Sequence, residues 1–410
     1  MRIKVKHIIK VILMFSLIMC WGISVGYSNN IKSDNKVVNF YFENDEVTTK
    51  KIDELTESRK DLMFAGWMEE GIQTISNPDL NRNVENLKIL FIKGSSSLLI
   101  NSSMLFQDDI DGCLIDEDTA YKLFGSIHGI GQNIEYNGRN LVVRGIHKET
   151  KANVIMQPLD KDIIILDGIT MDVKDLNLSE IDEFKMQSGF KEFSISGGVY
   201  YYIAKFASLL FPVGALILIL IKVTVQAIKI RQKPVLLAIY IIISLAIIFI
   251  FFKITNINIK IPLDLIPNKW SDFDFWTRLW KEYIDKFEYI LYMKKNGVDI
   301  YNIENLAMAV VYSILTIVLF IINLKVIKIK VIKELIIVMG ILIVSTFITV
   351  LLVYLKYGFD INIAMIWLIY PLYLGAEYFL KNLIKEEKLL TSVGDIYLKI
   401  QQEEIKSTSI

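Results

Sequence analysis

The sequence predicts an α-helical polytopic membrane protein with about six transmembrane helices and one extracytoplasmic α+β domain. Hydrophobic residues make up 53% of the 410 residues, and the mean hydropathy is +0.42. This composition is too apolar for an ordinary soluble enzyme. A long polar region separates the first apolar segment from the others, and it has enough residues to build a core of its own.

Six apolar segments approach the roughly 20 residues that a helix needs to cross the hydrocarbon layer of a bilayer. They are Ile8–Tyr27, Tyr200–Ile221, Val235–Phe252, Leu306–Leu324, Leu335–Leu355 and Ile361–Leu380. The first segment has a basic start and small residues near Gly26 and Ser28, so a cleaved signal peptide is the alternative to a retained anchor. We favour the anchor, and the later topology is the same either way.

The placement of basic residues predicts the orientation. The chain carries 45 basic and 45 acidic residues, so its net charge is zero and gives no information about topology. Lysine and arginine nevertheless gather before the first segment, between the second and third, and between the fourth and fifth. Under the positive-inside rule these three stretches are cytoplasmic. Both termini are therefore expected on the cytoplasmic side of the cell membrane, with Asn29–Gly198 and Thr255–Asn305 on the outer side.

This topology divides the chain into six parts. They are an N-terminal anchor (1–28), an extracytoplasmic α+β domain (29–198), transmembrane helices 2 and 3 (199–253), an outer segment with an amphipathic aromatic helix (254–305), transmembrane helices 4 to 6 (306–380) and a cytoplasmic tail (381–410). Within the outer domain, Val37–Phe42 and Leu87–Ile92 read as strands, and Thr48–Lys60 has a helical pattern.

The most informative stretch is Cys113–Ile146. Asp116 is a favoured N-cap residue, and the two acidic residues after it suit a helix's first turn. Gly125 suits the left-handed position that follows a helix end. Asn137-Gly138 is the strongest short signal for a tight hairpin, and Arg139–Ile146 reads as the returning strand.

This stretch resembles the MacB-like periplasmic core domain of the FtsX-like ABC transporter permeases. The matching features, in order, are Asp116-Glu117-Asp118-Thr119-Ala120, Leu123-Phe124-Gly125, Ile130-Gly131, Asn137-Gly138 and Val143-Arg144-Gly145-Ile146. The match is close over these residues and looser from Val37 onward. The resemblance implies that the defining residues build the domain and do not touch substrate. These residues are Asp116, Thr119, Phe124, Gly125, Gly131, Asn137 and Gly145.

The resemblance implies a permease-like subunit that exports, or acts mechanically on, a peptide, lipid or antibiotic-like molecule. A separate polypeptide would supply the ATPase, because the chain has no GxxxxGK[ST] phosphate loop. The docking loop would be Lys222–Pro234, with Lys229, Arg231 and Lys233 as contact residues. This loop departs from the family because it is short and basic, and the family typically has four membrane helices.

A non-transporting membrane sensor or accessory protein that uses the same outer domain is the alternative function. It accounts better for the missing coupling pattern in the loop. The two hypotheses differ in whether a companion ATPase exists. The expected partners are the lipid bilayer, that ATPase and, as an open alternative, a second copy of the chain; no nucleic acid is expected.

The second outer segment predicts an interfacial helix. Ser271-Asp272-Phe273-Asp274 resembles a capping box, and an aromatic face then repeats at helical spacing toward Met293. Trp270, Trp276 and Trp280 would lie at headgroup depth. We expect a helix on the membrane or under the outer domain, with a lateral gate or a binding surface for an amphipathic substrate as the alternative.

No catalytic, cofactor or metal site is expected, and the chain is not expected to be an enzyme. Cys20 and Cys113 belong to different parts of the chain and are not expected to pair. The three histidines are scattered, without metal-ligand spacing. Among ionisable residues in the apolar segments, Lys205 is expected to snorkel outward and Glu377 to pair with Lys381 one turn later.

Overall fold

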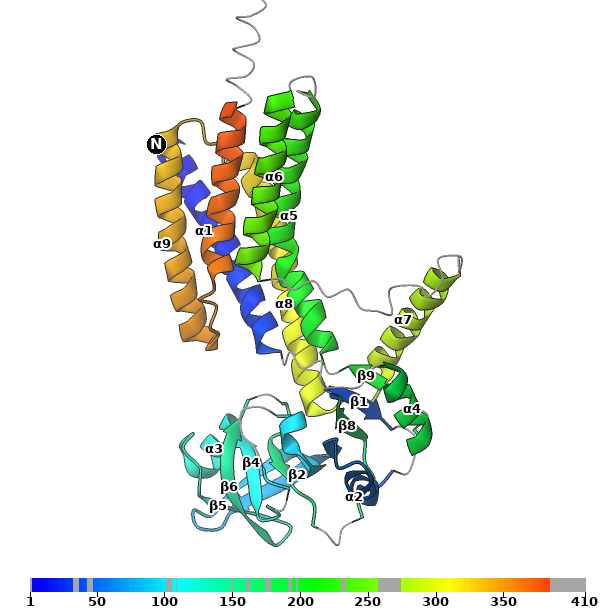
Figure 1. Ribbon diagram of the computed structural model, residues 1–410. Coiled ribbons are helices and arrows are strands. Elements are labelled where there is room, and N and C mark those ends of the chain that lie inside the picture. The colour runs from blue at the N-terminus through cyan, green and yellow to red at the C-terminus, as the bar shows by residue number, and fades with distance from the viewer. Residues whose placement is uncertain are drawn as a thin grey trace, which may run out of the picture. The chain divides into compact units, whose positions relative to one another are not determined.

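The computed structural model describes residues 2–31, 37–42, 47–100, 105–107, 109–148, 150–159, 163–173, 178–190, 194–196, 198–229, 234–256 and 274–383 (Figure 1). They form two compact units. The helical unit comprises Met1–Asn30, Ala204–Lys260 and Met308–Ile410, and the sheet unit comprises Ile31–Ile203 and Ile261–Ala307. The chain therefore leaves and re-enters each unit, as expected for a domain inserted between membrane helices.

Five described helices are long and apolar enough to cross a membrane. They are α1 (Arg2–Asn30), α5 (Val199–Lys229), α6 (Pro234–Thr255), α8 (Gly297–Val326) and α9 (Ile332–Tyr357). The sixth predicted segment is helical over residues 364–383 but is not among these five, so its crossing remains a prediction. The predicted class, a polytopic membrane protein with a separate α+β domain, is confirmed.

The helical unit is held together by close contacts of α1. The α1 helix packs against α9, and Gly22 leaves room for Ile361 and Thr349, whose atoms would lie 2.9 and 3.0 Å from an added Cβ. Trp21 donates a hydrogen bond from its indole nitrogen to the Ser208 carbonyl oxygen at 3.1 Å. The α6 helix differs, because most of its side chains are exposed within the unit.

The sheet unit contains nine described strands in the order β3-β7-β4-β6-β5-β2-β8-β1-β9. They are β1 (Val37–Tyr41), β2 (Phe64–Asn77), β3 (Arg82–Gly94), β4 (Gly112–Asp116), β5 (Asn133–Tyr136), β6 (Arg139–His147), β7 (Val154–Met156), β8 (Gly168–Asp172) and β9 (Ser194–Ser196). Because β3 also pairs with β2, the first six strands of this order close on themselves. The strands β8, β1 and β9 extend the sheet beyond β2.

Short helices complete the sheet unit. They are α2 (Thr49–Ser58), the 3-10 turn η1 (Ser96–Leu98), α3 (Glu117–Phe124), α4 (Leu178–Ser188) and α7 (Phe275–Tyr292). One apolar core fills the closed part of the sheet, under α3, and includes Ile89, Ile115, Leu123 and Val143. A second core lies around Trp67 and Leu90, and the residues on either side of the α7–α8 corner pack into it.

The recognised stretch folds as its residues predict. The Asp116 carboxylate accepts a hydrogen bond from the Thr119 amide at 2.8 Å, and Gly125 ends α3 with φ of 73°. Asn137 and Gly138 both have positive φ, 49° and 77°, which matches the type I′ turn of a two-residue hairpin. The predicted strand, helix, glycine turn and hairpin are therefore confirmed.

The longest strand, β2, was not predicted. Its first half is buried, but Glu69, Glu70 and Gln73 interrupt the apolar pattern, and a register shift lies between Glu70 and Gln73. Ile72 lies in this bulge with φ of 58° and is 82% exposed. The bulge breaks the period of two on which strand prediction depends.

His147 is a buried ionisable group of this unit. Its side chain, at the end of β6, is fully buried. Burial lowers the pKa of the imidazole from its ordinary value near 6.5 to about 4, although the nearby Asp116 carboxylate opposes the shift. The ring is therefore neutral in the folded unit at neutral pH.

We expect acid to destabilise the sheet unit through His147. The unfolded chain takes up the proton below about pH 6.5 but the folded one only near pH 4, so stability present above 6.5 is lost as the pH falls through this window. The full loss is roughly 3 kcal/mol. Hydrogen exchange of the β6 amides, followed as a function of pH and corrected for intrinsic exchange rates, measures this loss of stability.

His147→Leu should remove the His147 contribution to the pH dependence of the opening free energy, whereas replacing the exposed His128 by glutamine should leave that contribution in place. The same slope in His147→Leu as in the unsubstituted chain would contradict the assignment.

Candidate functional site

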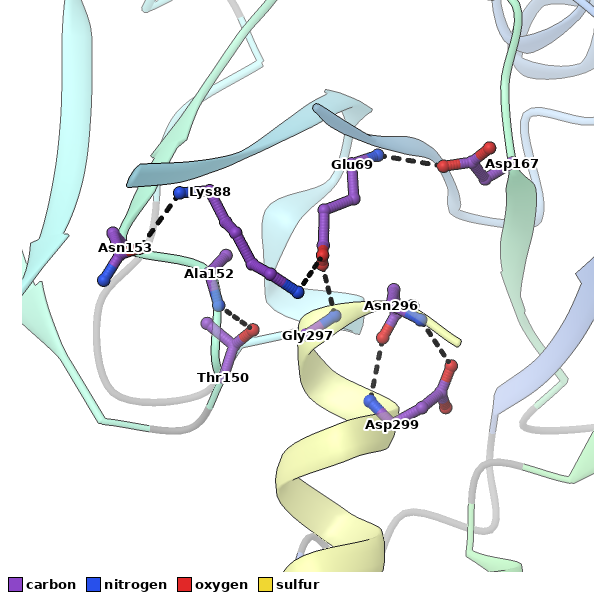
Figure 2. Close-up of polar contacts among 9 residues, drawn as sticks. All are labelled: Glu69, Lys88, Thr150, Ala152, Asn153, Asp167, Asn296, Gly297 and Asp299. Carbon is purple, nitrogen blue, oxygen red and sulfur yellow. Dashed lines mark hydrogen bonds and ion pairs between the residues drawn. The ribbon is translucent and has the colours of Figure 1, made fainter. Parts of the chain in front are cut away.

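The corner between α7 and α8 contains a reciprocal cap. The Asn296 side-chain oxygen accepts a hydrogen bond from the Asp299 amide at 2.8 Å. The Asp299 carboxylate in turn accepts one from the Asn296 amide at 3.2 Å (Figure 2). Two backbone donors that a helix N-terminus leaves without intrahelical partners are thereby satisfied. The cap fixes the first turn of α8.

Glu69 of β2 holds this first turn against the sheet. Its Oε2 accepts a hydrogen bond from the Gly297 amide at 2.5 Å, and its Oε1 lies 3.1 Å from the Lys88 ammonium on β3 (Figure 2). The Glu69 side chain is only 11% exposed. A carboxylate is also electrostatically favourable at a helix N-terminus. We call the set of contacts that hold this first turn, Asn296 to Asp299, against the sheet the α8 joint.

Gly297 allows the close approach at the α8 joint. The Lys151 amide donates to the Gly297 carbonyl oxygen at 2.9 Å. A Cβ at Gly297 would lie 2.5 Å from Thr150 Oγ1 and 2.6 Å from the Ala152 nitrogen. Since one of these atoms belongs to the backbone, the loop before β7 would have to move to admit any side chain.

Two ion pairs flank the α8 joint. The Lys294 ammonium lies 2.5 Å from the Asp167 carboxylate, which also accepts a hydrogen bond from the Glu69 amide at 3.0 Å. The Lys151 ammonium lies 2.6 Å from Glu304, about two turns along α8 from Gly297. Lys151 and Glu304 are 45% and 57% exposed, and an exposed pair of this kind contributes about 0–1 kcal/mol. Lys294 is 62% exposed, whereas its partner Asp167 is only 15% exposed. The buried contacts therefore contribute more to holding the joint.

Tyr41 of β1 binds the cap from the other side. Its hydroxyl donates to the Asp299 carboxylate at 3.0 Å, and both side chains are buried. Burial raises the pKa of Tyr41, and the Asp299 carboxylate raises it further, so the hydroxyl keeps its proton. A cavity of about 30 Å³ beside this contact is lined by Asn39, Tyr200 and Asn302, among others. Tyr200 places the first turn of α5 at the same site.

A chain of hydrogen bonds links the recognised stretch to the α8 joint. The Asp116 carboxylate accepts from the Asn153 side-chain amide at 2.9 Å. Asn153 accepts from the Lys88 backbone amide at 2.9 Å, and the Lys88 ammonium pairs with Glu69. Asp116 therefore caps α3 and also orients the strands that carry the joint.

The other domain-defining residues build the fold. Thr119 is fully buried in α3, and the Phe124 ring lies 2.6 Å from where a Cβ of Gly129 would be. Gly131 has φ of 84°, and its amide donates to the Val143 carbonyl oxygen at 2.8 Å. Gly145 is buried opposite Leu114, just past a register shift in β6. The structure brings none of these four to the α8 joint.

The predicted docking loop is shorter than the sequence analysis assumed. The α5 helix continues to Lys229, so Lys222–Lys229 is helical and only residues 230–233 connect it to α6. Lys229 is exposed at the end of α5, whereas Arg231 and Lys233 lie outside the described residues. The α5 helix thus extends eight residues beyond Ile221, where the predicted membrane segment ended.

The aromatic helix is present as α7. Trp276 and Trp280 are 53% and 69% exposed, and Trp270 lies outside the described residues, as do Ser271, Asp272 and Phe273 of the predicted capping box. Asp274 precedes the helix but makes no side-chain cap hydrogen bond. At the other end, Tyr289, Ile290 and Met293 pack into the core around Trp67. The helix is therefore anchored at its C-terminal end.

Two remaining expectations concern charges and cysteines. Glu377 pairs with Lys381 at 2.7 Å as predicted, and also with Lys222 of α5 at 3.1 Å. Cys20 and Cys113 are both free. Among the described residues no group of three His, Cys, Asp or Glu side chains is placed to hold a metal ion.

The sequence analysis missed the residues that form the α8 joint. Asn296 and Asp299 have the spacing of a cap, which would have placed the start of α8 correctly. Glu69 and Tyr41 carry no local signal, because their partners lie 228 and 258 residues away in the sequence.

No protein-family model and no curated protein matches this chain. The solved structures that are similar to part of it include the following two. The periplasmic region of MacB from Actinobacillus actinomycetemcomitans is 13% identical, with a TM-score of 0.33, over 41% of this chain and 91% of that one. The extracellular domain of the noncanonic ABC-type transporter YknZ from Gram-positive bacteria is 14% identical, with a TM-score of 0.29, over 38% of this chain and 97% of that one.

We expect Gly297→Ala to weaken the α8 joint. The added methyl group must displace the backbone at Ala152, at a cost of about 1–3 kcal/mol. Hydrogen exchange should show a lower free energy of opening for the amides of Lys151 and Gly297 in the full chain.

Gly340→Ala in α9 is the matched control, because nothing lies within 4 Å of its added Cβ. It should be neutral or slightly stabilising, since alanine favours helix over glycine. Equal effects of the two substitutions would contradict the close packing inferred at Gly297.

Proposed function

We propose that this chain is the membrane subunit of an ABC-type transporter, permease-like and without a nucleotide site of its own. The observation that carries the proposal is the α8 joint, where a membrane helix begins inside the sheet unit on buried contacts. The residue pattern of Cys113–Ile146 supports the same class. In this proposal both termini are cytoplasmic, the sheet unit is extracytoplasmic, and the chain catalyses no reaction.

The joint supports a mechanical role for the sheet unit. The first turn of α8 is fixed by Glu69 through Gly297 and by Tyr41 through Asp299. Because Tyr41 and Asp299 are buried and Glu69 is only 11% exposed, a displacement of α8 costs less by moving the strands with it than by breaking the contacts. A movement of the membrane helices, driven by a separate ATPase, would thus reach β1, β2 and β3.

The cargo in this proposal is a peptide, lipid or antibiotic-like molecule. The exposed face of α7 supports an amphipathic cargo or a membrane surface, since Trp276, Trp280 and Ile284 recur every four residues and are all exposed. Among the described side chains of α7, those that pack into the core around Trp67 lie at its end next to α8. A shift of α8 would therefore also move α7.

The proposal is tested by identifying what co-purifies with the tagged full chain from its native membrane in mild detergent. We expect a stoichiometric ATP-binding subunit, lost when Lys229, Arg231 and Lys233 are all replaced by glutamine. Mass spectrometry of the eluate measures both.

Replacing Lys325, Lys328 and Lys330 by glutamine removes the same charge from another connection on the same predicted side, and should leave the subunit bound. Repeated recovery without any ATPase, where a known ABC complex stays intact, would contradict the permease proposal. The shortness of the α5–α6 connection would then favour the membrane sensor or accessory protein.

A further inference from the structure

A three-residue charge network joins two helices of the helical unit. The Glu377 carboxylate lies 3.1 Å from the Lys222 ammonium of α5 and 2.7 Å from Lys381. Glu377 is only 14% exposed, whereas Lys222 and Lys381 are 37% and 52% exposed. The Glu377 side chain is thus mostly covered by protein, whereas both lysine side chains are partly exposed. Together the three groups carry a net charge of +1.

An apolar cavity of about 110 Å³ begins one turn away from this network. It is lined by α5, α6 and the helix of residues 364–383, with Ile219, Phe251, Tyr373 and Ala376 among the lining residues. Ile219 lies one turn before Lys222, and Ala376 is next to Glu377 in the sequence.

Tyr373 connects the cavity to the charges. Its ring lines the cavity, and the Lys222 ammonium lies 5.9 Å from the ring centroid, within the range of a cation–π contact. An elongated molecule with its anionic end at Lys222 and Lys381 would thus reach the apolar cavity at the next turn. The loosely packed α6 forms one wall of that cavity.

We propose that Lys222, Lys381 and the adjoining cavity bind one anionic phospholipid from the surrounding leaflet. The phosphate would accept hydrogen bonds from the two ammonium groups, and an acyl chain would occupy the cavity between α5, α6 and the helix of residues 364–383. Each lysine donates one hydrogen bond or ion-pair contact to Glu377, and an ammonium has three donors, so donors remain for the phosphate. This site does not depend on the proposed transport function.

Charge and position select this ligand. A zwitterionic lipid brings a cationic group that the two lysines would repel, whereas an anionic headgroup is attracted by each basic residue near the surface. Both α5 and α6 are apolar enough to cross a membrane, so the cavity lies where acyl chains are the available ligands.

The test uses the delipidated full chain in mild detergent and native mass spectrometry. Phosphatidylglycerol and phosphatidylcholine with identical acyl chains are titrated separately. We expect one phosphatidylglycerol molecule to be retained and no phosphatidylcholine. Lys222→Gln with Lys381→Gln should weaken binding roughly 25-fold, about fivefold for each ammonium.

Two further variants make the result interpretable. The double variant leaves Glu377 buried without a cation, which can impair folding. Adding Glu377→Gln removes that buried charge, and this triple variant should fold and still fail to retain the lipid. Ala376→Phe fills the cavity without changing any charge and should also reduce retention.

The matched control replaces two exposed lysines, Lys325 in the last turn of α8 and Lys328 just after it, by glutamine and should bind as the unsubstituted chain does. Equal retention of the two lipids would overturn the proposal. An unchanged affinity in the folded triple variant, or an equal loss in the control, would also overturn it.

Discussion

The arrangement of the sheet unit depends on the contact between the Glu69 carboxylate and the Gly297 amide. A helix N-terminus leaves backbone donors without partners, and a buried donor without a partner costs about 1–3 kcal/mol. Glu69 satisfies one such donor and places negative charge where the helix dipole favours it. Because Lys88 also pairs with Glu69, the carboxylate is not left as an isolated buried charge. The start of α8 is therefore part of the sheet unit's interior.

The ranking of the contacts at the α8 joint follows from burial. The Lys294–Asp167 and Lys151–Glu304 pairs are short, but Lys294 and Lys151 are 62% and 45% exposed, and holding a long side chain in place costs entropy. The Tyr41–Asp299 hydrogen bond is longer, at 3.0 Å, yet both partners are buried. Loss of one partner there leaves the other unsatisfied, so the buried contacts decide whether the joint holds.

The sequence predicted elements whose signals are local. Asp116, Gly125 and Asn137 act within a few residues through a cap or a positive φ, and each adopts the expected conformation. The long apolar helices were predicted for the same reason. β2 was missed because the bulge at Ile72 interrupts its period, and the α8 joint because Glu69 and Gly297 are brought together only by the fold. No local pattern encodes a contact across more than 200 residues.

Glu377 illustrates the same limit for charges. From sequence it pairs with Lys381 one helical turn away, which alone would indicate a solvated helix end. The structure adds Lys222 from α5, and this second cation changes the interpretation: the carboxylate is covered, and two helices are tied together. A local pair stabilises a helix by only a few tenths of a kcal/mol, whereas a shared buried carboxylate fixes the spacing of two helices. The network thus ties α5 to the helix of residues 364–383, and these are two of the three helices that line the cavity beside Tyr373.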